Sequence, residues 1–598
     1  MISPSIYSYI KGEESRYETD EVRVGENWNW NMKNHVQMLF HLKNGVFFTS
    51  ENDWMRSFKN IMEPMLNLSY WTEDIEVKDV DFYTENERAR VYSFLLKKYH
   101  NEVYVREHDL DTLFDEITES DLDFGGVVVQ KGSKRPELVS LVKIAFCDQS
   151  DILGAPIGVK YSFSPSALRK MKKAGWGNTK NGATIDLEDL IMLASYEKEP
   201  AGMSDTKKNQ STGKIIEVYL VRGDLPEHYL KDNDNMDEWY YQVHVVAFYE
   251  NKDGNKEGVT LFRIKGNEDD LMFHSCKPIE NRALGRGVGE SLLHPQIWTN
   301  FLSIHKTKML EAAAKVPLYT DDPNLTNRNV VQDMDNLELL TLADGKRIYQ
   351  TPTASPVNQQ MFDAEEQSWL SQAQLAAAAF DPILGKEQNS GTTFRGQERT
   401  VAQGRGLHDR RRGQRAKFIE NIYRKWIIPD MKKELLRGKK FLASLTADEI
   451  TWVSDEMAEN YADKQIIEDL FNLRIPQDKE VYKQEFKQKF VKNGDKFMIE
   501  IMEGEMEDIE IKIGINIANK QKDLVGLSDK ILSVFQFALA NPVPPHLQKS
   551  FNDILEYGGL SPADFSNVLK ASQTAPQPQV GISNQIPQLN LNTSQSNV

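Results

Sequence analysis

Residues 385–425 constrain the fold of this chain more than any other stretch. A polar, glycine-bounded loop (385–391) interrupts a helical pattern, and an arginine-studded helix follows it directly. Between Arg395 and Lys425 there are ten Lys or Arg residues against three acids, a local net charge of +7 in a chain whose net charge is −17. A concentrated charge against an opposite background needs a counter-charge. The sequence therefore predicts that this helix meets a polyanion, the acidic face of a neighbouring subunit, or both.

Length and composition predict a folded protein of several domains. A single hydrophobic core stops growing at roughly 250 to 300 residues, and this chain has 598. Its 40% hydrophobic and 27% charged residues are typical of a folded soluble protein. No run approaches the ~18 to 20 apolar residues of a membrane span, and the first ten residues lack the pattern of a secretory signal. We therefore expect no membrane partner and a protein that stays in the compartment where it is made.

The cysteines and the acidic balance exclude further classes. Cys147 and Cys276 lie far apart, without neighbours at metal-ligand spacing, so we expect neither a disulfide framework nor a zinc site, and a reducing cytoplasm fits. A sequence pI near 5.3 argues against a protein that coats nucleic acid, because binding driven by counterion release needs a basic face. Transient contact with DNA stays open.

The first half of the chain predicts a sheet with helices around it. Apolar residues at helical spacing indicate helices over 34–48 and 54–71, with a break or restart at Pro64. Alternating and β-branched segments predict strands, and Asp253-Gly254 predicts a hairpin turn. The predicted strands are 125–130 paired with 138–146, then 215–221, and 240–249 paired with 259–264.

The second half is predicted to be mainly helical, so the fold class is α+β, predominantly α. Helices are expected over 291–315 and 357–380, separated by two short strands within 337–350, and the basic helix is expected to run toward Gly438 with a kink near Pro429. Further helices are predicted over 455–473, 524–540 and 547–557, with strands at 496–502 and 509–517, and a Gln, Asn, Ser and Pro rich tail from about 571 is predicted to be disordered.

The segments that resemble motifs for catalysis or cofactor binding lack residues that those motifs require. Gly285, Gly287 and Gly289 invite a phosphate-binding interpretation, but Glu290 stands where the dinucleotide fingerprint needs glycine, so a tight interdomain turn is favoured. No P-loop occurs, and the acidic run 232–237 lacks the ligand pattern of a calcium loop. We therefore expect no catalytic residues, no metal, no cofactor and no enzymatic activity.

The order of features in residues 284–436 resembles one known family. Gly-Arg-Gly-Val-Gly-Glu-Ser (285–291) opens a helix, a small β insert follows, and a second helix closes on Ala-Ala-Ala-Phe-Asp-Pro-Ile-Leu-Gly (377–385). After a loop comes Thr-Thr-Phe-Arg-Gly-Gln-Glu (392–398), which fits Thr-x-x-Arg-x-x-Glu. This order resembles the portal proteins of tailed bacteriophages, also called head-to-tail connectors. Each fragment alone is weak, and the specificity lies in their order over about 150 residues.

The resemblance implies a portal-like architecture with named parts. A mixed α/β wing would surround a two-helix stem, a small α/β clip would meet tail or adaptor proteins, and a loop would line a central tunnel. The implied parts are the wing (1–285 and 439–518), stem helices (286–315 and 357–382), clip (316–356), tunnel loop (383–395), long wing helix (396–438), helical crown (519–570) and disordered tail (571–598).

The resemblance also implies a function and partners. Such proteins form rings, usually dodecamers, at one capsid vertex, and double-stranded DNA is packaged and ejected through the channel. Implied partners are further copies of this chain, the major capsid protein, the terminase large subunit, and then a tail or adaptor protein. The implied location is the portal vertex of the virion, and the host cytoplasm during assembly. A mostly acidic channel with few cationic contacts suits the passage of DNA, because strong phosphate neutralisation would hold the duplex in place.

Three sets of residues carry these expectations. The tunnel-loop set would contact the DNA backbone, although Lys386 could instead pair with Glu387 of a neighbouring loop. For the basic-helix set, ion pairs between subunits are favoured over DNA contact. The sets are the tunnel loop (Lys386, Gln388, Asn389 and Arg395), the basic helix (Arg399, Arg405, Arg410, Arg411, Arg412 and Arg415) and the clip (Asp344, Lys346 and Arg347).

Glycines inside the basic helix need a separate explanation. Gly404, Gly406 and Gly413 each cost about 1 kcal/mol relative to alanine, so they either allow the close approach of a neighbouring subunit or mark a kink.

Two alternatives to a channel protein stay open. One is a soluble nucleic-acid-processing enzyme that uses the basic helix, and the other is a different virion assembly or adaptor protein.

Overall fold

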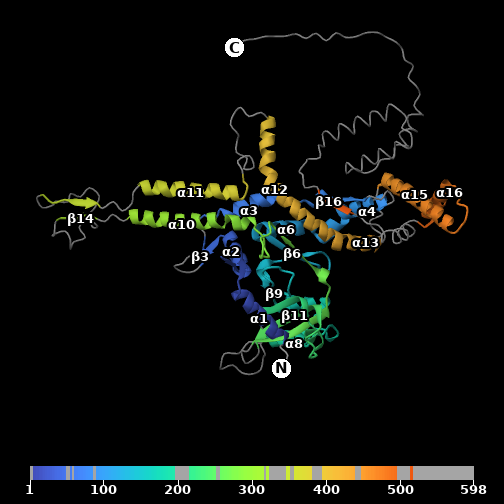
Figure 1. Ribbon diagram of the computed structural model, residues 1–598, viewed down its shortest axis with the longest axis horizontal. Coiled ribbons are helices and arrows are strands. Elements are labelled where there is room, and N and C mark those ends of the chain that lie inside the picture. Colours follow the sequence, from blue (N-terminus) through green and yellow to red (C-terminus); the bar gives the residue numbers. More distant parts are fainter. Residues whose placement is uncertain are drawn as a thin grey trace, which may run out of the picture. The chain divides into compact units, whose positions relative to one another are not determined.

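The computed structural model of the protein shows a chain of mixed helix and strand (Figure 1). Its described residues form two compact units. Apart from gaps, the first is built from residues 5–84, 96–434 and 512–515, and the second from residues 89–95 and 435–493. The described residues are 5–48, 54–56, 59–84, 89–194, 214–250, 256–314, 318–321, 345–350, 356–379, 394–437, 446–493 and 512–515.

A five-stranded antiparallel sheet with the order β12-β11-β10-β9-β8 anchors the first unit. Its strands are rich in β-branched and aromatic residues, and successive side chains alternate between two buried faces. Val218 packs with helix α8 (Leu187–Ala194), whereas Tyr219 and Val221 belong to the core that contains Ile10 of α1. The strands are β8 (Ile144–Phe146), β9 (Ile157–Phe163), β10 (Ile216–Pro226), β11 (Trp239–Glu250) and β12 (Lys256–Lys265).

Smaller sheets complete the β structure of the described residues. A three-stranded sheet has β6 (Gly126–Gln130) between β7 (Glu137–Val139) and β13 (Leu271–Ser275). Gly125, at φ 79°, ends α6 and turns the chain directly into β6. Antiparallel pairs are β1 (Val22–Val24) with β2 (Trp28–Trp30), β3 (Val46–Phe48) with β4 (Trp54–Arg56), β5 (Val80–Tyr83) with β16 (Lys512–Ile515), and β14 (Leu318–Thr320) with β15 (Ile348–Gln350).

The helices of residues 6–231 pack in more than one core, and the second core gathers α2, α3 and α6 with α10 (Val288–Ala314). Leu39 of α2, Leu66 of α3 and Leu292 of α10 meet there, each almost fully buried. Side chains of Ser5 and Asn31 cap α1 and α2 by accepting hydrogen bonds from the first helical turn. The helices are α1 (Ile6–Thr19), α2 (Met32–Lys43), α3 (Met62–Glu73), α4 (Arg90–Tyr99), a π turn (His100–Tyr104), α5 (Val105–His108), α6 (Leu110–Phe124), α7 (Pro165–Lys170) and α9 (Glu227–Lys231).

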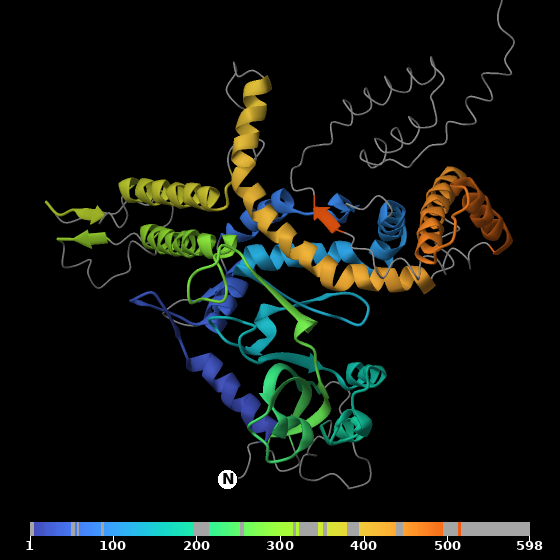
Figure 2. The same cartoon turned by 45° about the vertical axis from the view of Figure 1, so that its right-hand side comes forward.

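Two long helices form a hairpin. α10 (Val288–Ala314) and α11 (Pro356–Ala376) lie side by side in both views, and the β14/β15 pair lies at their far end from α3 (Figures 1 and 2). α12 (Phe394–Ile422) follows, and its N-terminal part stands clear of the other described elements of the unit. A π turn (Tyr423–Ile427) joins α12 to α13 (Ile428–Arg437).

The second unit contains an antiparallel helix pair, α15 (Ala447–Phe471) and α16 (Lys479–Asn493). A capping box starts α15, because the Thr446 side chain accepts from the backbone of Glu449 while the Glu449 side chain accepts from that of Thr446. Phe486 of α16 is fully buried and lies beside Tyr461 of α15, which holds the pair together.

The predicted hairpin of 240–249 with 259–264 is confirmed as β11 and β12, and both long helices of the α10/α11 hairpin are confirmed. Helix 34–48 was predicted too long, because α2 ends at Lys43 and β3 follows. Helix 54–71 begins only at Met62, so Pro64 lies in the first turn, where a missing N–H costs little.

Other boundaries also needed correction. The predicted strand 138–146 is split, since β7 pairs with β6 while β8 joins the five-stranded sheet. β15 pairs with β14, and the other strand expected within 337–350 lies outside the described residues. The irregularity predicted near Pro429 is the π turn just before it, and α16 was missed. Segments 496–502, 519–570 and 571–598 lie outside the described residues. Among those described, none of the helices combines the length and apolarity that crossing a membrane requires.

Candidate functional site

The glycine-rich turn before α10 is a packing element. A Cβ on Gly285 would stand 1.6 Å from the carbonyl oxygen of Cys276, and one on Gly289 would stand 2.3 Å from that of Asp123. The Gly285 N–H donates to the carbonyl of Gly125 at 3.0 Å. Backbone therefore packs directly on backbone here, and this close approach is a sufficient reason for glycine at these positions in a tight turn.

An arginine fixes this turn to the start of α10. Arg282 is almost fully buried and donates to both carboxylate oxygens of Glu290, at 3.0 and 2.6 Å. Its guanidinium also lies 4.6 Å from the ring centre of Trp30. A bidentate pair of this kind sets direction as well as distance, so it orients α10 at its origin.

A pair of stacked rings and an ion pair connect the two helices of the α10/α11 hairpin. Trp298 and Trp369 stack with centroids 6.1 Å apart and an interplanar angle of 11°. Lys306 pairs with Asp363 across the hairpin. Trp298 is 49% exposed, so the aromatic pair presents a large apolar area on the outside of the hairpin.

Two of the three predicted clip residues lie in the β14/β15 region. The Lys346 ammonium donates to the carbonyl of Asp321 at 2.8 Å, and the backbone carbonyl of Arg347 accepts from the Thr320 hydroxyl at 3.0 Å. Arg347 is exposed. Tyr319 and Tyr349 stack on each other, with centroids 5.0 Å apart, and both are exposed. Asp344 lies outside the described residues.

The arginine-rich helix α12 has two different halves. For Arg395, Arg399 and Arg405 only the helical backbone is described. Around Gly406 the helix is exposed, and apart from its own helix no atom of the described residues lies within 4 Å of where a Cβ would stand. From His408 onward the helix is embedded in the first unit, although Arg410 stays exposed. Predicted tunnel-loop residues Lys386, Gln388 and Asn389 lie outside the described residues.

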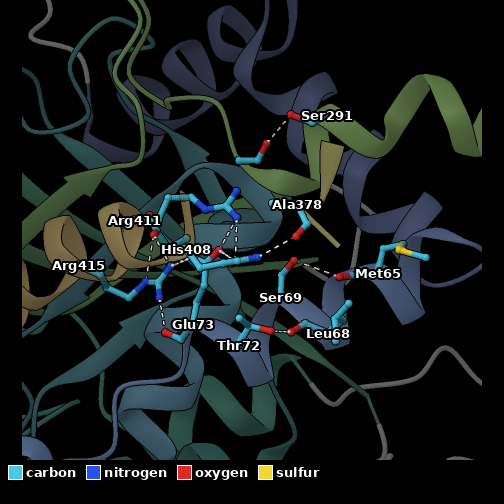
Figure 3. A network of polar contacts seen from close by, with 12 residues as sticks. Met65, Leu68, Ser69, Thr72, Glu73, Ser291, Ala378, His408, Arg411 and Arg415 are labelled. Atoms are coloured by element: carbon cyan, nitrogen blue, oxygen red, sulfur yellow. Dashed lines mark hydrogen bonds and ion pairs between the residues drawn. The ribbon is translucent and has the colours of Figure 1, made fainter. Parts of the chain in front are cut away.

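The embedded half of α12 enters a buried charge cluster (Figure 3). Arg415 donates to the Asp121 carboxylate at 3.0 and 3.1 Å and to the Glu73 carboxylate at 3.3 Å. Arg411 forms an ion pair with the other Glu73 oxygen, which also lies 2.7 Å from Nδ1 of His408. Glu73, Asp121 and Arg415 are each at most 1% exposed, so the cluster is shielded from solvent.

The charges in the cluster stabilise one another. Burial alone would raise the pKa of the Glu73 carboxyl, but the His408 hydrogen bond and the Arg411 and Arg415 charges lower it below the ordinary value of 4.5. Burial lowers the pKa of the nearby His274 in spite of the Asp121 carboxylate. The cluster thus holds Glu73 ionised and joins α3, α6 and α12.

This corrects the expectation for part of the basic helix. Arg411 and Arg415 were predicted to pair with a neighbouring subunit or DNA, whereas both pair with acids of their own chain. Arg412 is also buried, at 3% exposure, with a charge interaction toward Asp74. The reason is geometric, because α12 packs on α3 and three of its arginines face inward.

Sequence reasoning missed Glu73, Asp121 and His408. Glu73 closes an amphipathic helix and Asp121 lies in the acidic run of α6, where an acid usually faces solvent. The one sequence feature that pointed to them was the excess of arginine on α12. It predicts acidic partners but does not give their positions in the sequence. Within the described part of the chain, no group of three or more His, Cys, Asp or Glu side chains is placed to hold a metal ion.

Comparisons with known proteins give distant structural likenesses. No family model and no curated protein matches the chain. One solved chain is from "Neck of empty GTA particle computed with C6 symmetry", with TM-score 0.33, 9% identity, and coverage of 90% of this chain and 97% of that one. Another is from "Virion of native gene transfer agent (GTA) particle", with TM-score 0.31, 10% identity, and coverage of 93% and 100%.

Proposed function

We propose that this chain is the subunit of a portal ring, a channel at one capsid vertex through which double-stranded DNA is packaged and later ejected. The observation that carries the proposal is the order of elements: a glycine-packed turn, α10, the β14/β15 pair, α11 and then the arginine-rich α12. The sequence resemblance to portal proteins has the same order.

The distribution of charge supports this proposal. A chain with net charge −17 avoids strong phosphate binding, as a channel for moving DNA requires. Neutralisation of Arg411 and Arg415 within the chain removes two cations that would otherwise hold DNA. The remaining candidates for DNA contact are Lys386, Gln388, Asn389 and Arg395, and those for contact between subunits are Arg399, Arg405 and Arg410.

The hairpin supplies a surface for further partners. We assign the β14/β15 region, with Lys346, Arg347 and the exposed tyrosine pair, to docking of the tail or adaptor protein, after the terminase large subunit has used the same end of the ring. The major capsid protein would surround the ring in the virion.

The oligomeric state tests the proposal. Light scattering after size-exclusion chromatography should give a closed ring of on the order of ten to thirteen subunits, and negative-stain images should show a central hole. A protein that stays monomeric at high concentration, or a ring without a hole, would contradict the proposal.

A second assay addresses the rival enzyme. Incubation with linear and circular double-stranded DNA, with and without Mg²⁺ or Mn²⁺, should leave both substrates intact. Metal-dependent cleavage by a monomer would favour a nucleic-acid-processing enzyme. An assembly that binds particles but encloses no DNA-sized hole would favour an adaptor protein.

A further inference from the structure

The end of α11 adopts a conformation that its sequence does not favour. Ala377, Ala378 and Ala379 are each at most 2% exposed, and Ala378 has φ 56°, in the left-handed region. This position after a helix is usually glycine, because a Cβ is disfavoured there. The turn still closes, since the Ala378 N–H donates to Leu375 O at 3.1 Å and the Ala379 N–H to Gln374 O at 2.7 Å. Something outside the turn must hold Ala378 in place.

One side chain reaches this turn from a distant part of the sequence. His408 Nε2 donates to the carbonyl oxygen of Ala378 at 3.2 Å, while its Nδ1 lies 2.7 Å from the Glu73 carboxylate (Figure 3). The ring thus links two distant parts of the chain, and Nδ1 also lies 3.2 Å from a guanidinium nitrogen of Arg411. Glu73 is fixed in turn by Arg411 and Arg415. These contacts hold the imidazole with Nε2 toward the carbonyl oxygen of Ala378.

We propose that His408 is a positioning residue that fixes where α11 ends and where the chain leaves for α12. His408 lies about four turns into α12, so its hydrogen bond joins the exit from α11 to the helix that receives the chain again. The end of α11 is thus connected to α12 twice, once through the chain itself and once through the Glu73–His408–Ala378 contact. This rests on the proposed function for its importance, because the predicted DNA-contacting residues lie between these points.

Hydrogen exchange of the full chain tests the proposal. His408→Leu removes both hydrogen bonds, and protection of the Ala378 and Ala379 amides should fall by about tenfold or more, while protection in the β10/β11 core stays unchanged. His408→Gln keeps a donor near Ala378 O and should retain most of the protection. Ser291→Ala is the matched control, because its hydroxyl is drawn beside the cluster but donates to the carbonyl of Gly287, the residue before α10, at 3.3 Å.

A rescue variant separates positioning from general packing. Ala378→Gly relieves the left-handed conformation, so in the His408→Leu background it should restore protection to within about threefold of the original. If His408→Leu alone fails to fold, recovery of folding by Ala378→Gly supports the proposal and its failure overturns it. Unchanged protection in a folded His408→Leu protein, or loss of protection without rescue, also overturns it.

The outcome is independent of the proposed function. Exchange at residues 377–379 is measured whether or not the protein forms a ring. If the protein forms no ring but shows the expected exchange pattern, only the portal proposal is contradicted. A ring whose His408→Leu variant keeps full protection would sink the positioning role alone.

Discussion

At the scale of single residues, Arg415 shows how far a charge can lie from its counter-charge along a sequence. Its partners Glu73 and Asp121 are 342 and 294 positions away. Local charge counting identified the excess of arginine on α12 and could not find these acids. Buried charges of this kind are costly unless every partner is present, so the cluster is sensitive to any one change.

Glu73→Gln should destabilise the protein by about 3 kcal/mol, because it leaves the buried Arg411 without its carboxylate partner and Arg415 with Asp121 alone. Chemical denaturation followed by circular dichroism measures this change. Glu63→Gln is the matched control, since Glu63 lies exposed on the same helix and its loss should change stability by less than about 0.5 kcal/mol. Equal effects of the two substitutions would contradict the role of the cluster.

The same carboxyl predicts a pH dependence. The pKa of Glu73 is lower in the folded chain than its ordinary value of 4.5, so its contribution is fully present above that value and is lost as pH falls through the folded pKa. The difference in unfolding free energy between the original protein and Glu73→Gln should therefore shrink below pH 4.5. A difference that stays constant down to the acid-unfolding limit would count against it.

Gly285→Ala tests the turn before α10. The new Cβ would collide with the Cys276 carbonyl, so we expect a loss of about 3 kcal/mol or failure to fold. Gly12→Ala on α1 is the control, since nothing lies within 4 Å of its Cβ position and alanine should stabilise the helix by up to about 1 kcal/mol. Thermal unfolding compares the two, and a Gly285→Ala protein as stable as the original would refute the packing explanation.

At the scale of elements, the α10/α11 hairpin was the most predictable part of the second half. Its apolar residues recur at helical spacing over many turns, which is the strongest local signal in a sequence. Short elements were less predictable, because β3, β4 and β7 contain three residues each, too few for an alternating pattern to stand out. α16 was missed because its outward face is crowded with lysines and its apolar positions are few.

The candidate site was predictable only in outline. Glycines 285–289 and the arginines of α12 stood out by composition, and their neighbourhood followed the order of a known family. The cluster of Glu73, Asp121 and His408 could not be found, because its members lie on three helices whose packing no local pattern encodes.

A double-mutant cycle on Trp298 and Trp369 tests the hairpin. Replacing each by alanine, singly and together, should give a coupling free energy of about 1 kcal/mol, because the rings stack on each other. Met361→Ala, at an exposed position of α11, should couple weakly with either. Coupling near zero between the tryptophans would show that the stack adds nothing beyond their separate burial.

At the scale of the whole molecule, the exposed half of α12 offers the sharpest test of assembly. Apart from its own helix, none of the described residues comes within 4 Å of the Gly406 Cβ position, so no described contact explains its small size. We expect Gly406→Ala to leave the single chain folded and to stabilise helix α12 by up to about 1 kcal/mol. The same change should reduce the fraction of closed rings. Light scattering together with circular dichroism separates these effects, and rings formed as well as before would show that no neighbour approaches there.

The pairing of β5 with β16 has a consequence for biosynthesis. Tyr83 and its neighbours emerge from the ribosome long before their partner strand, Lys512–Ile515, has been translated. At ordinary elongation speeds, β5 stays without its partner strand for roughly tens of seconds. During that time the unpaired backbone N–H and C=O groups of its edge can pair with any other extended segment. Nascent copies on a crowded polysome would therefore run a risk of mispairing that finished copies do not share.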